Sequence, residues 1–201
     1  MDAKTKESKD NYDKKAREYE STPEGKYTLP FNRYLCEHVP FRKHDRILDI
    51  GCGNGRLLKM ITNKVRVEAF GIDISGEMIK AAQEENREIT FYVSEADNTP
   101  FEDGFFDIIT VCCAFHHFVD PEAFLKETHR ILKPQGKIYI ADPTAPGIIR
   151  LIENFYFTRL KTGDVRIYNR AEMKDLLDRV NFGGFTCKTD GYKMIVEGCR
   201  T

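Results

Sequence analysis

A glycine-rich turn at residues 51–55 is the first feature of the chain that could do chemistry. It follows a short apolar run over 46–50, which contains one acid, Asp49, and precedes apolar positions at helical spacing over 57–61. A strand, a Gly-x-Gly-x-Gly turn and a helix let a ligand approach the backbone closely, because glycine has no Cβ. The same pattern also fits an ordinary tight turn, so it needs support from the rest of the chain.

A carboxylate at the end of the next predicted strand supports a nucleotide site. Asp73 can accept hydrogen bonds from both hydroxyls of a ribose at the adjacent strand end. The alternative is that Asp73 caps the helix beginning near Ser75. Arg56 stands where the dinucleotide fingerprint Gly-x-Gly-x-x-Gly has its third glycine, and a bulky side chain there opposes the close helix packing of an NAD site.

Two adjacent histidines could take part in proton transfer. His116 and His117 follow the fourth predicted strand, at the sheet edge where open α/β folds bind ligands. A pKa near neutrality suits histidine to accept a proton, so both are weak candidates for a general base. The alternative is a structural role, with the rings bonded to the backbone. No Cys or His spacing resembles a zinc site, and we expect no metal.

These side chains need a sheet that places them at one edge. Strands and helices alternate, which predicts a parallel sheet with helices on both faces. The predicted strands are 46–50, 67–72, 89–93, 105–113 and 137–141, with helices beginning near 57, 78 and 120. Later helices are predicted over 148–160 and 169–180, and strands over 185–189 and 192–197 form a hairpin. We therefore predict an α/β, Rossmann-like, doubly wound fold with a mostly parallel sheet and an antiparallel C-terminal edge hairpin.

The first forty residues precede this alternation. Residues 4–20 are highly charged, yet an apolar stripe at helical spacing predicts a solvated helix that packs along one side. The stripe consists of Tyr12, Ala16 and Tyr19. Residues 22–25 are expected to break this helix, and a second one is predicted over 30–39. Aromatic residues that could line an acceptor pocket, with core packing as the alternative, are Tyr12, Tyr19, Phe155, Tyr156 and Tyr168.

The length and composition set the class of protein. A chain of 201 residues suits a single domain, which we divide into an N-terminal helical lid (1–40), a cofactor-binding core (45–142) and acceptor-side helices with the edge hairpin (143–201). The 31 basic and 32 acidic residues give a net charge of −1, so we expect no nucleic-acid partner.

The chain carries no apparent targeting or membrane signal. No apolar run is long enough to span a membrane, and the first twenty residues lack the apolar stretch of a signal peptide. The six cysteines form no recognisable pairing pattern, which favours reduced thiols and a cytoplasmic location. A nucleophilic Cys113 stays an open alternative.

The motifs, taken in order, resemble those of the class I S-adenosylmethionine-dependent methyltransferases. Residues 49–55 resemble their motif I, and Asp73-Ile74-Ser75 with Met78 resembles the segment after their second strand. Glu95-Ala96 and residues 130–136 resemble the segments after the third strand and before the fifth, although Glu95 and Gln135 replace the usual Asp and Gly. The resemblance covers residues 45–142 and is strongest for the small-molecule and quinone-type branch.

This resemblance implies S-adenosylmethionine as the cofactor, bound over three strand ends. Asp49 and the backbone of 51–53 would hold the ammonium and carboxylate of its methionine part, and Asp73 would hold the ribose. Glu95 and Ala96 would bind adenine. With Ile74 and Met78 flanking the ring and Cys113 at the end of the fourth strand, the expected set is Asp49, Gly51, Cys52, Gly53, Asp73, Ile74, Met78, Glu95, Ala96 and Cys113.

The function that follows is methyl transfer from S-adenosylmethionine to a small-molecule acceptor. A sulfonium methyl is already activated, so the protein has to align the acceptor and exclude water, and a general base is optional. Residues 112–115 lack the Asn-Pro-Pro-Tyr type of sequence associated with methylation of planar amino groups. Two alternatives stay open: an NAD-dependent oxidoreductase and a non-catalytic S-adenosylmethionine-binding module. We expect a monomer or a homodimer.

Overall fold

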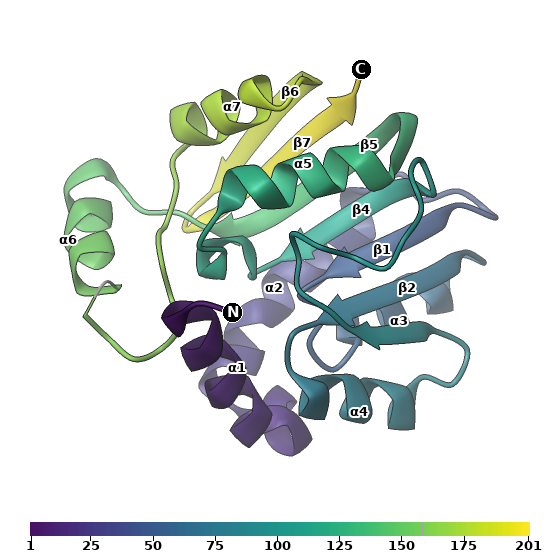
Figure 1. Ribbon diagram of the computed structural model, residues 1–201, viewed down its shortest axis with the longest axis horizontal. Coiled ribbons are helices and arrows are strands. Elements are labelled where there is room, and N and C mark those ends of the chain that lie inside the picture. Colours follow the sequence, from purple (N-terminus) through teal and green to yellow (C-terminus); the bar gives the residue numbers. More distant parts are fainter. Residues whose placement is uncertain (158) are drawn as a thin grey trace.

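A seven-stranded sheet forms the centre of the computed structural model, which describes residues 1–157 and 159–201 (Figure 1). The strand order is β3-β2-β1-β4-β5-β7-β6. Neighbouring strands from β3 to β5 are parallel, whereas β7 runs antiparallel to both β5 and β6. The predicted Rossmann-like fold with an antiparallel C-terminal edge hairpin is therefore confirmed.

The elements follow the predicted alternation of strands and helices. The strands are β1 (Arg46–Ile50), β2 (Glu68–Asp73), β3 (Thr90–Val93), β4 (Phe106–Cys112), β5 (Leu132–Pro143), β6 (Phe182–Asp190) and β7 (Lys193–Arg200). The helices are α1 (Ala3–Lys15), the 3-10 helix η1 (Ala16–Ser21), α2 (Pro23–His38), α3 (Arg56–Lys64), α4 (Gly76–Glu85), the 3-10 helix η2 (Phe115–His117), α5 (Pro121–Ile131), α6 (Gly147–Phe157) and α7 (Arg170–Arg179). None of these helices, over the described ranges, combines the length and apolarity that a membrane crossing requires.

The core lies on both faces of the sheet because successive strand residues point to opposite sides. On β1, Leu48 and Ile50 belong to the cluster that α5 and α7 cover, whereas Ile47 belongs to the cluster under α2, α3 and α4. Phe106 and Phe31, one in each cluster, are completely buried. The two apolar layers hold the strand ends in fixed relative positions.

The N-terminal segment differs from the prediction in two respects. The first helical segment does end before Thr22, as predicted, but residues 22–25 also start the next helix: the Thr22 hydroxyl accepts a hydrogen bond from the Gly25 amide, and Pro23 occupies the first turn of α2. The prediction that the second helix begins near residue 30 was therefore wrong, and Pro30 lies inside α2. The first helix also ends early, because residues 16–21 form the 3-10 helix η1.

Three strand boundaries and one helix boundary also need correction. The predicted stop at 134–136 lies within β5, which begins at Leu132 with an irregular register opposite Phe106 to Ile108. Both hairpin strands extend further than predicted at the ends away from the turn, since β6 begins at residue 182 and β7 ends at residue 200. The helix predicted over 148–160 ends at residue 157, and the predicted range includes residue 158, which lies outside the described residues.

Arg56 joins the N-terminal helices to the core. Its guanidinium donates hydrogen bonds to the Gly25 carbonyl oxygen (2.8 Å) and to the Thr28 hydroxyl (2.6 Å), both on α2. The neighbouring Asn54 amide donates to the Glu20 carboxylate on η1 (3.1 Å). The residue that interrupts the dinucleotide fingerprint thus attaches α2 to the first turn of α3.

Replacing Arg56 by Met should lower the free energy of unfolding by about 1–3 kcal/mol, because both charge-assisted hydrogen bonds from its guanidinium to α2 are lost. Limited proteolysis should also cut the first 22 residues faster. The matched control is Arg33→Met on the exposed side of α2, which should change stability by no more than about 0.5 kcal/mol. Equal denaturant midpoints for the two variants would contradict this role of Arg56.

Candidate functional site

A cavity of about 290 Å³ opens at the carboxyl ends of the central strands. Figure 1 shows the arrowheads of β1, β2 and β4 pointing toward α1, which borders the cavity with η1, η2 and the segments after β2 and β3. The structure brings together most of the expected site here: Gly51, Gly53, Asp73, Ile74, Met78, Glu95, Ala96 and Cys113, with the candidate base His117. Asp49 and Cys52 border a smaller adjoining cavity of about 30 Å³, and His116 lines neither.

The glycine turn has a backbone that few other residues could adopt. Gly51 and Gly53 have φ angles of 71° and 53°, in the left-handed region that favours glycine. A Cβ on Gly51 would lie 2.5 Å from the Ala114 Cβ, so this part of the turn packs tightly on the end of β4. A Cβ on Gly53 would meet no atom within 4 Å. The Gly53 backbone therefore borders open space in the cavity.

Asp73 holds the glycine turn and also faces the cavity. One carboxylate oxygen accepts from the Gly53 amide and the other from the Ser75 amide, each at 2.9 Å. The helix cap is Ser75, whose hydroxyl accepts from the Met78 amide (3.1 Å). Burial raises the pKa of Asp73, and the two amides partly offset that rise. Each oxygen keeps a second lone pair, so hydroxyl donors in the cavity can still be bound.

Asp49 is a buried carboxyl without a cationic partner among the described residues. Asp49 is only 2% exposed, and its carboxylate accepts a hydrogen bond from the Thr110 hydroxyl at 2.7 Å. Burial raises the pKa of Asp49 to about 7. The smaller cavity that it borders adjoins the main one at Tyr19, Gly51 and Gly53. A cationic group bound there would favour the ionised carboxylate.

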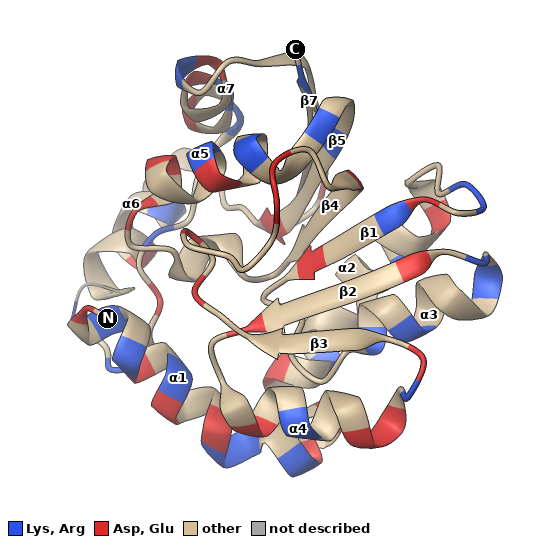
Figure 2. Ribbon diagram, turned by 45° about the vertical axis from the view of Figure 1, so that its right-hand side comes forward, with Lys and Arg blue, Asp and Glu red and all other residues tan. Residues whose placement is uncertain are grey.

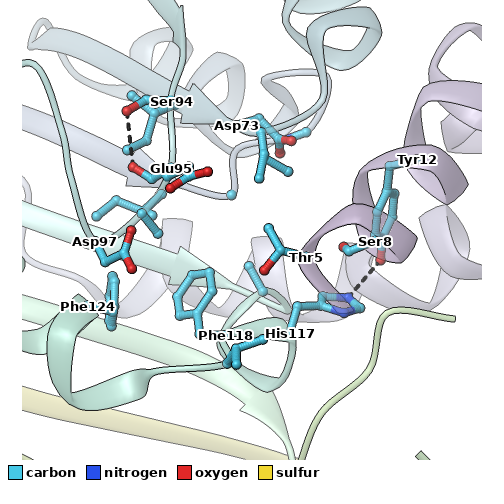
Figure 3. A pocket seen from close by; sticks show the side chains of 18 of the residues that line it. Thr5, Ser8, Tyr12, Asp73, Ser94, Glu95, Asp97, His117, Phe118 and Phe124 are labelled. Atoms are coloured by element: carbon cyan, nitrogen blue, oxygen red, sulfur yellow. Dashed lines mark hydrogen bonds between the residues drawn. The ribbon is translucent and has the colours of Figure 1, made fainter. Parts of the chain in front are cut away.

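The cavity wall next to Asp73 combines apolar and acidic groups. Met78 is buried, Ile74 and Ala96 are half-buried, and the Glu95 side chain is 47% exposed, 3.9 Å from the N-terminal amine. Figure 3 shows Glu95 and Asp73 on the same side of the cavity, across from Tyr12 and His117. This arrangement offers apolar contacts to a flat ring and a carboxylate acceptor at its edge.

The two histidines have different surroundings. Nδ1 of His117 lies 3.1 Å from the Gly163 carbonyl oxygen, to which it donates, so its Nε2 accepts from the Tyr12 hydroxyl at 3.1 Å (Figure 3). Burial, with the charge of His116, lowers the pKa of His117 to about 3. Burial opposes protonation of His116 as well, but the carboxylates of Asp142 and Asp164 raise its pKa. The histidine that faces the cavity is thus the weaker base.

Sequence reasoning missed several residues of the lining. Thr5 and Ser8 lie on α1 beside Tyr12, and Asp97, Phe118 and Phe124 complete the wall near Glu95. Ser8 could have been found, because it precedes Tyr12 by one helical turn on the same side of the helix. Phe118 and Phe124 carry no comparable signal, since their apolar side chains fit equally well in the core.

Only part of the expected aromatic lining is present. Tyr12 and Tyr19 line the cavity. Phe155 and Tyr156 do not, and their side chains are exposed on α6. Tyr168 is buried in the core, with its ring 5.2 Å from that of Phe115. The prediction that Phe155 and Tyr156 line the pocket was therefore wrong.

Comparison with known proteins identifies the same region. Residues 48–140 match the family model described as a methyltransferase domain. The chain is 33% identical over 119 residues to the demethylmenaquinone methyltransferase of Thermotoga maritima, covering 59% of this chain and 52% of that protein. It is 30% identical over 140 residues to the ubiquinone/menaquinone biosynthesis C-methyltransferase UbiE of Geotalea daltonii, covering 65% and 60%. The chain thus spans little more than half the length of these relatives.

Solved structures extend the likeness over nearly the whole chain. The putative methyltransferase that forms a complex with the Trm112 methyltransferase activator of Haloferax volcanii superposes with a TM-score of 0.81. The match covers 94% of this chain and 97% of that chain at 19% identity, which establishes the fold. The family match, the relatives and the shared fold agree: residues 48–140 resemble a methyltransferase domain, the matching relatives include quinone methyltransferases, and the whole chain has the fold of a solved putative methyltransferase.

Proposed function

We propose that this protein transfers a methyl group from S-adenosylmethionine to a small-molecule acceptor. The observation that carries the proposal is the cavity at the carboxyl ends of β1, β2 and β4. One part of its wall contains the glycine turn, Asp73 and Glu95, and the other contains Tyr12 and His117. Its volume of about 290 Å³ suits a small ligand and not a polymer. When bound, the cofactor supplies an activated methyl group.

The residues present fit this cofactor. Asp49 is a buried carboxyl that lacks a countercharge among the described residues, and the space over Gly53 is open. A ligand carrying an ammonium and a carboxylate would complete both features, with the Gly53 backbone beside the carboxylate. Asp73 would bind the ribose hydroxyls, and Glu95 would accept from the adenine amino group. Ile74 and Met78 would contact the ring, as Met does in many adaptable apolar sites.

The N-terminal segment 1–40 would act as the lid on the acceptor side. Through Thr5, Ser8 and Tyr12, α1 contributes directly to the cavity wall, and a closed wall keeps water from the reacting groups. Orientation of the acceptor supplies most of the rate enhancement in this proposal. The depressed pKa of His117 makes it a poor proton acceptor, and His116 does not reach the cavity lining. Neither histidine needs to act as a general base.

Aromatic hydroxy compounds are the first acceptor class to test. The relatives described above are named for methylation in menaquinone and ubiquinone biosynthesis. The cavity wall also contains the apolar rings of Phe118 and Phe124, which suit an aromatic ligand. We further propose a monomer or homodimer in a reducing compartment such as the cytoplasm, since all six cysteines are free thiols.

Calorimetric titration with S-adenosylhomocysteine, S-adenosylmethionine and NAD⁺ tests the cofactor assignment. We expect saturable binding of the first two and none of NAD⁺. Transfer of a labelled methyl group to a panel of hydroquinones, phenols, amines and thiols then tests the reaction. Binding of NAD⁺ alone would favour an oxidoreductase, and cofactor binding without transfer to any acceptor would favour a non-catalytic module.

Substitution of Gly53 by Ala should raise the Kd for S-adenosylhomocysteine at least about tenfold, because a methyl group would enter the space that the ligand needs. Gly191→Ala is a closely matched control. Gly191 also has a left-handed φ, 57°, and open space around its missing Cβ, but lies in the β6–β7 turn. Both variants should lose similar stability, about 1–2 kcal/mol. Calorimetry that gives equal Kd values for both would contradict the assignment.

Affinity for S-adenosylhomocysteine should depend on pH through Asp49. In the protein without ligand, burial raises the pKa of Asp49 to about 7, and the ammonium group of a bound ligand would favour the ionised carboxylate. Below that pH a proton must leave on binding, so the Kd should rise by up to about tenfold per pH unit and level off above it. Titration in buffers of different ionisation enthalpy measures the proton release.

The Asp49→Asn variant should bind more weakly and without this pH dependence. Asp175→Asn, on the exposed side of α7, should behave as the unmodified chain does. A pH dependence that persists in Asp49→Asn would assign the titration to another group, of which Asp73 is the first to examine.

A further inference from the structure

Two histidines and an aspartate from separate segments form a compact group behind the cavity wall. His116 Nε2 and His117 Nδ1 each lie 3.5 Å from the same carboxylate oxygen of Asp164. One potential ligand atom from each of the three residues lies within 4.8 Å of the others. Their side chains are only 12%, 11% and 19% exposed. The group therefore holds three metal-binding donors, two imidazole nitrogens and one carboxylate oxygen, in a largely buried environment.

The hydrogen bonds around His116 leave its Nε2 lone pair facing the carboxylate of Asp164, and a cation between them would remove the repulsion. Its Nδ1 lies 3.0 Å from an oxygen of Asp142, whose side chain is 2% exposed, so the ring proton belongs on Nδ1. The lone pair of Nε2 in a neutral ring then faces the Asp164 carboxylate. Two electron-rich atoms at 3.5 Å repel each other in a buried site. A second proton on His116 or a metal ion between the two atoms would remove this repulsion.

We propose that His116, His117 and Asp164 bind a first-row transition ion, with Zn²⁺ as the first candidate. Two imidazole nitrogens and a carboxylate oxygen are an established ligand set for this ion, with bonds of about 2.0–2.2 Å. Ligand atoms in a tetrahedral site are then about 3.4 Å apart, close to the two separations of 3.5 Å found here.

The surroundings of the three ligands support the same assignment. Asp142 holds the far nitrogen of His116, as carboxylates commonly do for metal-bound histidines. The Gly163 carbonyl oxygen, 3.1 Å from His117 Nδ1, offers a fourth donor. With the ion on Nδ1, the proton of the His117 ring lies on Nε2 and is donated to the Tyr12 hydroxyl. The contact between Tyr12 and His117 is thus compatible with both states.

The ion would fix the loop that carries Asp164 against η2. The amides of Val165 and Arg166 already donate to the His116 carbonyl oxygen, at 2.9 and 3.1 Å. On the other side of the loop, a Cβ on Gly163 would lie 2.5 Å from Ser8 Cα, so α1 packs directly on this loop. Metal binding would therefore stabilise the acceptor-side wall from behind, independently of any methyl transfer.

Cobalt titration of the untagged full-length chain, after removal of metals with a chelator, tests this site. We expect one Co²⁺ per chain, with visible absorption stronger than that of the aqueous ion, displacement by Zn²⁺, and a higher Tm on binding. Asp164→Asn should weaken binding more than about a hundredfold, and Asp142→Asn about 10–100-fold. Asp175→Asn and His38→Gln, both exposed and remote, are the matched controls and should bind Co²⁺ normally.

Three results would overturn the proposal. Absence of saturable Co²⁺ or Zn²⁺ binding would leave a protonated His116 as the cation between the two aspartates. Equal affinities of Asp164→Asn and Asp175→Asn would place the ion elsewhere. An intense near-ultraviolet thiolate band would indicate ligation by cysteine, such as the neighbouring Cys112 or Cys113. Circular dichroism of each metal-free variant verifies its fold, and calorimetry with S-adenosylhomocysteine separates a failure of this site from a failure of the cofactor site.

Discussion

Three successive amides of the glycine turn donate hydrogen bonds to the end of β2, and the arrangement of the site depends on them. The Gly51 and Cys52 amides donate to the Ile72 carbonyl oxygen, at 2.9 and 3.0 Å, and the Gly53 amide donates to Asp73. These bonds require left-handed backbone at Gly51 and Gly53, which excludes most side chains. They fix the end of β1 to the end of β2, so the part of the cavity wall formed by the glycine turn does not depend on the position of the N-terminal helices.

The same edge of the sheet accumulates buried negative charge. Figure 2 shows acidic residues at the arrowheads of β1 and β2, which correspond to Asp49 and Asp73, and Asp142 lies near the end of β5. Burial raises the pKa of all three carboxyls. A raised pKa in the folded state means that these groups contribute stability below their unfolded pKa, and that this contribution is lost as pH rises through the folded pKa. A bound cation would stabilise the ionised carboxylates at neutral pH, so this edge of the sheet favours a ligand with a positive charge.

Much of this site could be predicted because its residues lie in local patterns. The strands were found from apolar runs; Asp49 is the second-last residue of β1, Asp73 ends β2, and Glu95 lies two residues after β3. The start of α2 was missed because Thr-Pro-Glu-Gly is equally typical of a turn and of a helix N-terminus, and only the Thr22 hydrogen bond distinguishes them. Asp164 was missed for a different reason. Its partners are His116 and His117, and only the tertiary fold brings that loop to η2.

The N-terminal segment before β1, whose helices border the cavity, contributes no strand to the sheet. Residues before β1 are joined to the core through side chains such as Arg56 and Asn54, and through packing of α2, whereas every strand pairing is made by later residues. If α1 and η1 form the acceptor wall as proposed, this wall can vary in sequence without shifting the register of any strand. An exchange of the segment before Thr22 would then change the acceptor range and leave the strand ends with Asp49 and Asp73 in place.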